Sequence, residues 1–329
     1  MAYEEELRIA IEAVERASRL CRTVQQRLVA DSTLQKGDKS PVTVADFGAQ
    51  AIVSHLLATH FPDIPLVGEE DADALRQSEN GVLRQSVIDC VQAVQPELDG
   101  DTILNAIDRG TYQGGSSGRH WTLDPIDGTK GFLRLDQYAV ALALIEDGQV
   151  VLGVLGCPNM PVNAADASQG QGCIFSASKG QGSWQHALDN PGTPERISVD
   201  EGASLADAKL CESVETAHTS HSHSARISAR LGITAEPFRI DSQCKYAAVA
   251  RGDASIYLRL PTKPGYVEKI WDHGAGWCVV VEAGGTVTDV AGAPLDFGQG
   301  RRLENNRGVI VTNGRFHDEV LAAVQAELG

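Results

Sequence analysis

The chain has 329 residues and a formal net charge of −16 at pH 7. This length exceeds the usual size of a single core, so we expect one large domain or two closely packed ones with ample apolar content. The acidic balance argues against a protein that coats nucleic acid, which needs a basic face to release counterions. A small anionic substrate is still allowed, because a metal ion can reverse the local sign of a site.

The cysteines and the start of the chain indicate the cellular compartment. Seven scattered cysteines without C-x-x-C spacing favour reduced intracellular thiols, and they leave open whether any thiol is a redox switch. The acidic first residues have neither the order of a signal peptide nor that of a transit sequence, and we expect no apolar run of membrane-spanning length. The expectation is a cytoplasmic monomer that contacts no membrane.

The first third of the chain is predicted to be mainly helical. Apolar spacing predicts helices over 4–30 and 41–60, with Thr43 capping the second and Asp46 in its first turn. A short strand over 64–67 would deliver Glu69 and Glu70. The more polar stretch up to Arg109 predicts two or three further helices. A buried strand should then end at Asp124, because Pro125 cannot continue a hydrogen-bonded ladder.

The remaining chain alternates strand and helix signals. Asp147-Gly148 between two apolar runs predicts a hairpin of strands. Further strands are predicted at 172–176, 182–184, 209–212, 238–241, 254–260, 286–288 and 309–312, and helices at 222–231, from 243, 267–283 and 318–328. This alternation predicts a layered α/β sandwich with an N-terminal lobe over 1–188 and a C-terminal lobe over 189–329.

The most informative stretch is W-T-L-D-P-I-D-G-T-K-G-F at 121–132. Asp124 and Asp127 follow the predicted strand, Gly128 permits close backbone approach, and a short helix can begin at Thr129. Two carboxylates alone would repel each other, so a hard divalent cation with phosphate as the third component is the economical explanation. Taken alone, the stretch is also compatible with an ordinary polar turn.

Two further acidic corners change that balance: G-E-E-D at 68–71 and W-D-H-G-A-G at 271–276. By position alone, Asp46 and Asp272 fit a helix cap or first-turn acid. The three corners together, however, resemble the signature of the lithium-sensitive, magnesium-dependent phosphatases that include inositol monophosphatase and fructose-1,6-bisphosphatase. Longer strings, among them D-S-Q-C-K-Y at 241–246 and Y-L-R-L-P at 257–261, resemble the 3'(2'),5'-bisphosphate nucleotidases within that superfamily.

The resemblance implies a site that holds two or three Mg²⁺ ions. The implied metal ligands are Glu69, Asp124, the backbone carbonyl of Ile126, Asp127 and Asp272, with Glu70 supporting a weaker ion. Asp46 and Thr129 would orient and deprotonate the attacking water. The N–H groups of Gly128 and Thr129 would bind phosphate oxygens, and no phosphoenzyme is required.

The resemblance also implies a substrate. Ser242, Lys245 and Arg259 would contact the nucleotide, and His218 would do so at a position that His221 could also fill. The implied reaction removes the 3' phosphate of adenosine 3',5'-bisphosphate to give AMP, with 3'-phosphoadenosine 5'-phosphosulfate as a second substrate. Such an enzyme would serve sulfur metabolism and be inhibited by lithium.

Two alternatives stay open on the sequence. One is an inositol polyphosphate 1-phosphatase or inositol monophosphatase, since the metal motifs are shared throughout the superfamily. The other is a sensor that binds the nucleotide without turnover, which the full set of acidic residues argues against, because clustered carboxylates repel one another when no metal is bound.

Overall fold

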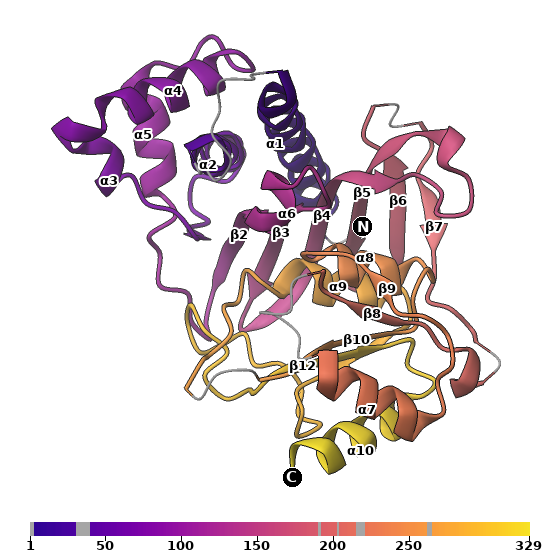
Figure 1. Ribbon diagram of the computed structural model, residues 1–329. Coiled ribbons are helices and arrows are strands. Elements are labelled where there is room, and N and C mark those ends of the chain that lie inside the picture. Colours follow the sequence, from indigo (N-terminus) through magenta and orange to yellow (C-terminus); the bar gives the residue numbers. More distant parts are fainter. Residues whose placement is uncertain (1–2, 31–39, 190–191, 203, 215–220, 262–264) are drawn as a thin grey trace.

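The computed structural model describes residues 3–30, 40–189, 192–202, 204–214, 221–261 and 265–329 (Figure 1). Two sheets organise these residues: a seven-stranded sheet in the order β1-β2-β3-β4-β5-β6-β7 and a five-stranded sheet in the order β11-β12-β10-β8-β9. The strands are β1 (Leu66–Gly68), β2 (Arg119–Asp127), β3 (Ala139–Glu146), β4 (Gln149–Pro161), β5 (Gln171–Ser178), β6 (Ser183–Ala187), β7 (Glu195–Ile197), β8 (Leu210–Glu212), β9 (Phe238–Arg239), β10 (Ile256–Arg259), β11 (Thr286–Thr288) and β12 (Val309–Thr312).

The helices pack on these sheets or on other helices. They are α1 (Glu4–Ala30), α2 (Ser40–His60), α3 (Asp73–Arg76), α4 (Gly81–Gln92), α5 (Gly100–Asp108), α6 (Thr129–Leu133), α7 (His221–Leu231), α8 (Cys244–Ala250), α9 (Gly274–Glu282) and α10 (His317–Leu328), with short 3-10 turns at Ser78–Asn80, Ala167–Gln169 and Leu205–Asp207.

Helix and sheet layers alternate through the molecule. In Figure 1, α1 and α2 cover one face of the seven-stranded sheet, α8 and α9 lie between the two sheets, and α7 and α10 cover the far face of the second sheet. Because side chains alternate along β4, the seven-stranded sheet packs against a different layer of helices on each face. Leu152 and Val154 pack in the core beneath α1 and α2, whereas Leu155 and Cys157 pack against α8 and α9. The predicted layered α/β sandwich is confirmed.

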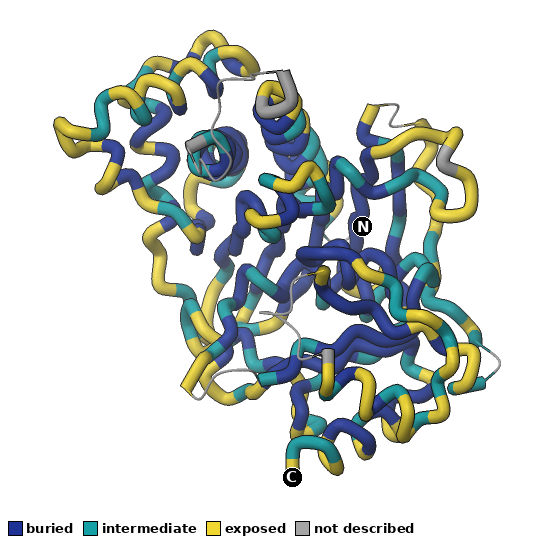
Figure 2. The backbone as a smooth tube through the Cα atoms, in the orientation of Figure 1, coloured by how far each residue is buried: buried dark blue, intermediate teal, exposed yellow. Residues whose placement is uncertain are grey.

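The layer of α8 and α9 is buried from both sides, as the dark tube between the sheets in Figure 2 shows. Close approach depends on small residues. A Cβ on Gly153 of β4 would lie 2.6 Å from the carbonyl oxygen of Ala275, and one on Gly276 would lie 2.4 Å from Cγ of Tyr246. Glycine at these two positions therefore lets α9 touch both the sheet and α8.

The start of α2 differs from the prediction. The helix begins at Ser40, so Thr43 lies within it instead of capping it, and Asp46 lies in its second turn. An acid in the second turn gains little from the helix dipole, which acts mainly on the terminal turn. The simplest structural explanation for Asp46 therefore loses its support.

The same helix corrects the expectation that no apolar run reaches membrane-spanning length. The helix over residues 41–60 is long and apolar enough to cross a membrane, but 72% of its most apolar stretch is buried inside the protein. Because α2 packs against α1, α4, α5 and β2, it has the environment of a core helix.

The central strand also runs further than predicted. β2 continues through Pro125 to Asp127, with a register shift in its pairing with β3: Asp124 pairs with Ala141, whereas Asp127 pairs with Ala139. Pro125 lies in this bulge, where the lack of an N–H group costs no ladder hydrogen bond. Side chains three apart in a regular strand face opposite sides, and the bulge instead lets both aspartates reach one cavity.

Two smaller boundaries were also misplaced. The predicted strand at 64–67 is β1, which begins only at Leu66. The predicted helix over 267–283 is α9, which begins at Gly274, and the segment before it forms an extended piece and a turn. That turn carries Trp271 and Asp272. The proposed lobe boundary near residue 189 stays a prediction.

Candidate active site

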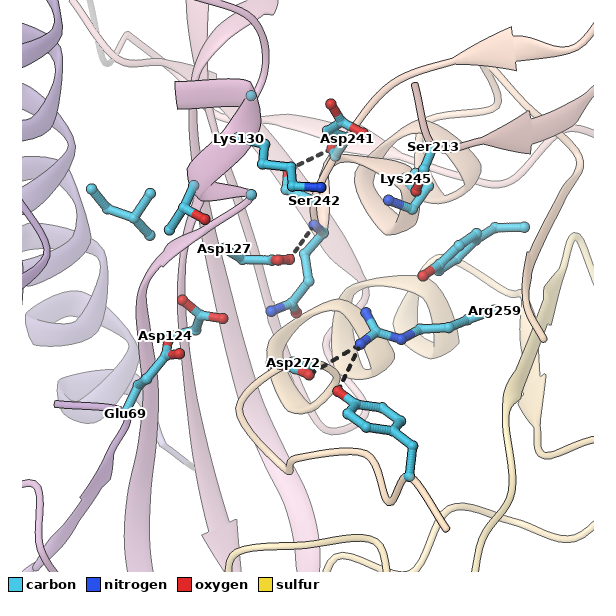
Figure 3. Close-up of a pocket in the computed structure, with 17 residues that line it drawn as sticks. Glu69, Asp124, Asp127, Lys130, Ser213, Asp241, Ser242, Lys245, Arg259 and Asp272 are labelled. Atoms are coloured by element: carbon cyan, nitrogen blue, oxygen red, sulfur yellow. Dashed lines mark hydrogen bonds and ion pairs between the residues drawn. The ribbon is translucent and has the colours of Figure 1, made fainter. Parts of the chain in front are cut away.

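A cavity of about 340 Å³ opens beside the end of β2 and is lined by residues of α6, α8 and β10, among others (Figure 3). Its walls combine acidic residues with basic, hydroxyl and aromatic ones. The lining residues are Glu69, Asp124, Ile126, Asp127, Gly128, Thr129, Lys130, Gly131, Ser213, Asp241, Ser242, Gln243, Lys245, Tyr257, Arg259, Tyr266 and Asp272. Figure 3 shows Glu69, Asp124 and Asp127 on one side and Lys245 and Arg259 on the other.

The turn after β2 joins the two halves of the cavity. Gly128 has φ +92°, a left-handed conformation, and a Cβ there would lie 2.8 Å from Cβ of Ser242. Ser242 itself has φ 64°, which is uncommon for a residue with a side chain. The adjacent Gln243 N–H donates to Oδ2 of Asp127 at 2.5 Å. This hydrogen bond and the close packing of Gly128 on Ser242 hold the D-G-T turn against the D-S-Q turn and maintain the uncommon backbone conformation of Ser242.

A buried glutamine shapes the Glu69 corner. Gln50 is fully buried on α2, and its amide nitrogen donates to the carbonyl oxygens of Glu70 at 2.5 Å and Ile107 at 2.9 Å. Its Oε1 accepts from the Glu70 N–H at 3.1 Å. A Cβ on Gly68 or Gly110 would approach the same amide to 2.6 Å. Both glycines therefore leave room for Gln50, which fixes the backbone beside Glu69.

The third acidic corner is tied to the basic side of the cavity. Arg259 contacts Glu268 at 2.8 Å and Asp272 at 3.3 Å, and His273 lies 3.2 Å from Glu268 and 2.7 Å from the Tyr246 hydroxyl. Burial by itself raises the pKa of Glu268, but the hydrogen bonds and charges of His273 and Arg259 outweigh burial and lower this pKa to about 2. Arg259 is therefore oriented before any substrate binds.

Lys245 is the second cation of the cavity. It is 5% exposed, and its ammonium nitrogen lies 5.1 Å from the centre of the Tyr257 ring. Burial lowers its pKa, and the charge of Asp127 opposes that shift. A buried ammonium near an open cavity gains from an anion that enters it.

Most of the predicted site residues line this one cavity, but three do not. Asp46 and Glu70 lie outside its lining, and His218 lies outside the described residues. Asp46 is nevertheless close enough to Glu70 and Glu69 for their charges to raise its pKa, after the larger effect of burial. His221, the alternative to His218, is the first residue of α7.

Sequence reasoning missed several residues of the site. Gln50 had no local signal, because its partners are distant in the chain. Asp241 and Gln243 stood inside a recognised string without an assigned role, and so did Tyr257. Tyr266 could have been suggested only by its place between two recognised strings.

Comparisons with known proteins agree with this geometry. Residues 2–328 match the model of the inositol monophosphatase family. The chain belongs to the inositol monophosphatase family. It is 45% identical to a 3'(2'),5'-bisphosphate nucleotidase of Schizosaccharomyces pombe, with 99% of this chain and 96% of the relative covered. It is 47% identical to 3'(2'),5'-bisphosphate nucleotidase 1 of Arabidopsis thaliana, with 99% and 97% covered.

Solved structures show the same family fold at low identity. An IMPase of Thermotoga maritima superposes with a TM-score of 0.64 at 22% identity, covering 98% of both chains. An inositol monophosphatase of Anabaena (Nostoc) sp. PCC 7120 gives a TM-score of 0.63 at 19% identity, covering 99% of this chain and 97% of the other.

The inositol monophosphatase family is typically metal-dependent, and buried carboxylates at and beside the cavity fit a metal. The Oδ1 atoms of Asp46 and Asp124 are buried, and neither has a hydrogen-bond partner among the described residues. Such orphaned carboxylate oxygens are costly unless a cation or a proton satisfies them. The donor set is made of oxygens, which suits a hard divalent ion.

The pKa shifts of the acidic residues also indicate that this side of the cavity is suited to a cation. Burial raises the pKa of Asp124 well above its usual range, and the charges of Glu69 and Asp127 raise it further. Glu69 faces the open cavity, yet desolvation by the surrounding protein and the charge of Asp272 raise the pKa of Glu69 to about 8. Without a cation Glu69 holds a proton near neutral pH, so a bound cation would displace it.

A nearby group of ligand atoms is less suited to a metal. Glu268, Asp272 and His273 bring ligand atoms within 4.8 Å of one another. Arg259, however, already contacts both carboxylates of this group. A guanidinium in that place satisfies the carboxylates, so Glu268 and His273 serve to orient Arg259.

Proposed function

We propose that the chain is a metal-dependent 3'(2'),5'-bisphosphate nucleotidase that removes the 3' phosphate of adenosine 3',5'-bisphosphate. One observation carries the proposal: a single cavity places carboxylates opposite Lys245 and Arg259. A substrate with two phosphates needs both sides, one where a phosphate is cleaved and one where a phosphate is retained. The identity of 43–47% with full-length bisphosphate nucleotidases supports the same assignment.

The acidic residues would hold the metal. Glu69, Asp124, Asp127, Asp272 and the carbonyl of Ile126 are the proposed ligands of two or three Mg²⁺ ions, with Glu70 beside them. When bound, such ions neutralise phosphate charge and make water a better nucleophile at neutral pH. The resemblance to the lithium-sensitive phosphatases implies inhibition by lithium, and the proposed reaction needs no phosphoenzyme.

The protein groups would position and deprotonate the reactants. Asp46 would accept a proton from the attacking water, since its raised pKa makes it a stronger base than a free aspartate. The Thr129 hydroxyl, at the first residue of α6, would orient that water. The N–H groups of Gly128 and Thr129 would bind the oxygens of the departing phosphate.

The retained phosphate would lie against the basic wall. Lys245 supplies a buried point charge and Arg259 a planar fork that Glu268 already orients. Ser242 supplies a hydroxyl at the junction of the two turns. Such preorganised donors favour a substrate with a second anionic group over one with a single phosphate.

The test is phosphate release from adenosine 3',5'-bisphosphate, inositol 1,4-bisphosphate and inositol 1-phosphate at equal concentration with Mg²⁺. We expect strong preference for the nucleotide, complete loss with a chelator, and loss in Asp124→Asn. Equal or faster turnover of inositol phosphates would reject the substrate assignment. Tight nucleotide binding without phosphate release would instead favour a sensor.

A further inference from the structure

Arg301 is not among the residues that line the cavity, yet its side chain donates hydrogen bonds to the backbone next to Glu69. One terminal nitrogen, Nη2, donates to the carbonyl oxygen of Gly68 at 2.6 Å. The other, Nη1, donates to the carbonyl oxygens of Gly110 at 3.1 Å and Tyr112 at 3.0 Å. Gly68 ends the edge strand β1 and directly precedes Glu69, so this fork fixes where the Glu69 side chain begins.

The same guanidinium also packs on the third acidic corner. Its central carbon lies 4.8 Å from the centre of the Trp271 ring, and Trp271 directly precedes Asp272. The backbone reinforces this contact, because the Ile270 N–H donates to the Arg301 carbonyl at 3.2 Å. The Leu303 N–H likewise donates to the carbonyl of Glu268 at 2.9 Å. Arg301 therefore joins two corners that come from opposite ends of the chain.

Those two corners carry charges that repel. Glu69 and Asp272 line the same cavity, so their carboxylates repel each other when both are ionised. Nearby carboxylates that are to share metal ions must be held at a fixed separation against this repulsion. The remaining contacts that we describe at the Glu69 corner, made by Gln50, anchor it to α2 and α5, not to Asp272.

Arginine suits this task better than lysine. A guanidinium can donate to three carbonyls in one plane while its face stacks on an aromatic ring. A lysine would supply the charge but only a single donor centre. The charge also offsets part of the surrounding acidity, since Glu69 and Asp71 are the acidic groups that act on Arg301.

We propose that Arg301 is a positioning residue that holds the Glu69 and Asp272 corners at the separation needed to bind metal ions, and so sets the metal affinity of the site. The proposal rests on the proposed metal-dependent function and adds a residue to it. Arg301 touches no reacting atom in this scheme. It acts through Gly68 and Trp271.

The experiment measures Mg²⁺ binding directly, by isothermal titration calorimetry of the full chain without substrate. Arg301→Met keeps a long apolar stem and removes the fork, and Arg301→Lys keeps the charge. Arg302→Met is the matched control, because Arg302 is the exposed neighbour. We expect at least tenfold weaker Mg²⁺ binding in Arg301→Met, a smaller loss in Arg301→Lys, and a change below twofold in Arg302→Met.

A second readout separates positioning from simple stability. The Mg²⁺ concentration that gives half-maximal phosphate release should rise in parallel with the calorimetric constant, while KM for the nucleotide at saturating Mg²⁺ changes less than twofold. If Arg301→Met does not fold, Arg301→Lys carries the same comparison.

The outcomes are distinct for the two proposals. Folded Arg301 variants that melt earlier but bind Mg²⁺ within twofold of the wild type would overturn the positioning role. Wild-type protein that binds Mg²⁺ but does not hydrolyse the nucleotide would overturn the proposed function, while the calorimetric comparison would still decide the role of Arg301. Wild-type protein that binds no Mg²⁺ would overturn both.

Discussion

Replacing Gln50 with leucine should destabilise the protein through the backbone of the Glu69 corner. The side chain is fully buried and makes hydrogen bonds of 2.5, 2.9 and 3.1 Å to the backbone of Glu70 and Ile107. Leucine has a similar size but offers no polar atom, so Glu70 loses the partners of both its backbone groups. Each bond contributes about 1 kcal/mol, and an unsatisfied buried group costs about 1–3 kcal/mol.

The expected loss in the free energy of unfolding is therefore about 3 kcal/mol. The unfolding entropy of about 2.1 cal/mol/K per residue gives about 0.7 kcal/mol/K for this chain, so the midpoint should fall by about 4 °C. Thermal unfolding followed by circular dichroism, in chelator, measures this shift. Because Glu69 lies next to the released backbone, calorimetry should also show weaker Mg²⁺ binding.

The matched control is Gln92→Leu. Gln92 makes one comparable bond, from Nε2 to the carbonyl oxygen of Leu98 at 2.8 Å, at a site remote from the cavity. We expect a loss of about 1 kcal/mol and no change in metal affinity. A Gln50→Leu protein that melts within 1 °C of the wild type, or binds Mg²⁺ equally well, would refute the reasoning.

Three further predictions concern packing, pH and the retained phosphate. Gly276→Ala should cost about 1–3 kcal/mol in denaturant unfolding, because the added Cβ would meet the Tyr246 ring at 2.4 Å, whereas Gly81→Ala, whose nearest neighbour would lie at 3.8 Å, should be neutral. Because the pKa of Glu69 is raised from 4.5 to about 8, metal-free folded protein binds the proton more tightly than the unfolded chain; this stabilisation is complete below about pH 4.5 and is lost as pH rises through about 8. Glu69 is exposed, so solvent screening reduces the effect to about 1–2 kcal/mol, measured as the loss of stability from pH 5 to pH 8 relative to Glu69→Gln in chelator; equal losses in both proteins would contradict it. Lys245→Ala should lower kcat/KM for adenosine 3',5'-bisphosphate about 10- to 100-fold in steady-state kinetics, through the loss of a charge-assisted hydrogen bond, and equal losses on inositol 1-phosphate would contradict a role in binding the retained phosphate.

Local chemistry explains why much of the fold could be predicted. The hairpin of β3 and β4 followed from Asp147-Gly148, and both residues adopt the positive φ that such a turn requires. The long helix α1 followed from apolar spacing alone and has the predicted bounds. These signals lie within a few residues of the structure that they determine.

The misplaced boundaries have the opposite origin. Pro125 was expected to end β2, but pairing with β3 resumes at Asp127, and the bulge places both aspartates on the cavity. The segment before α9 was predicted as helix, yet backbone bonds from 270 and 303 hold it extended beside residues 301–303. Pairing with a distant segment overrode the local preference in both places.

The sequence by itself indicated most of the carboxylates and cations that line the cavity, because motif residues carry their chemistry wherever the chain places them. The tertiary structure decided how these groups meet. Only folding brings Gln50 to Glu70, 20 residues along the chain. Only folding brings Arg301 to Gly68, 233 residues away, and onto the Trp271 ring. Such contacts arise from packing of whole layers, and no short stretch of sequence encodes the distances between them.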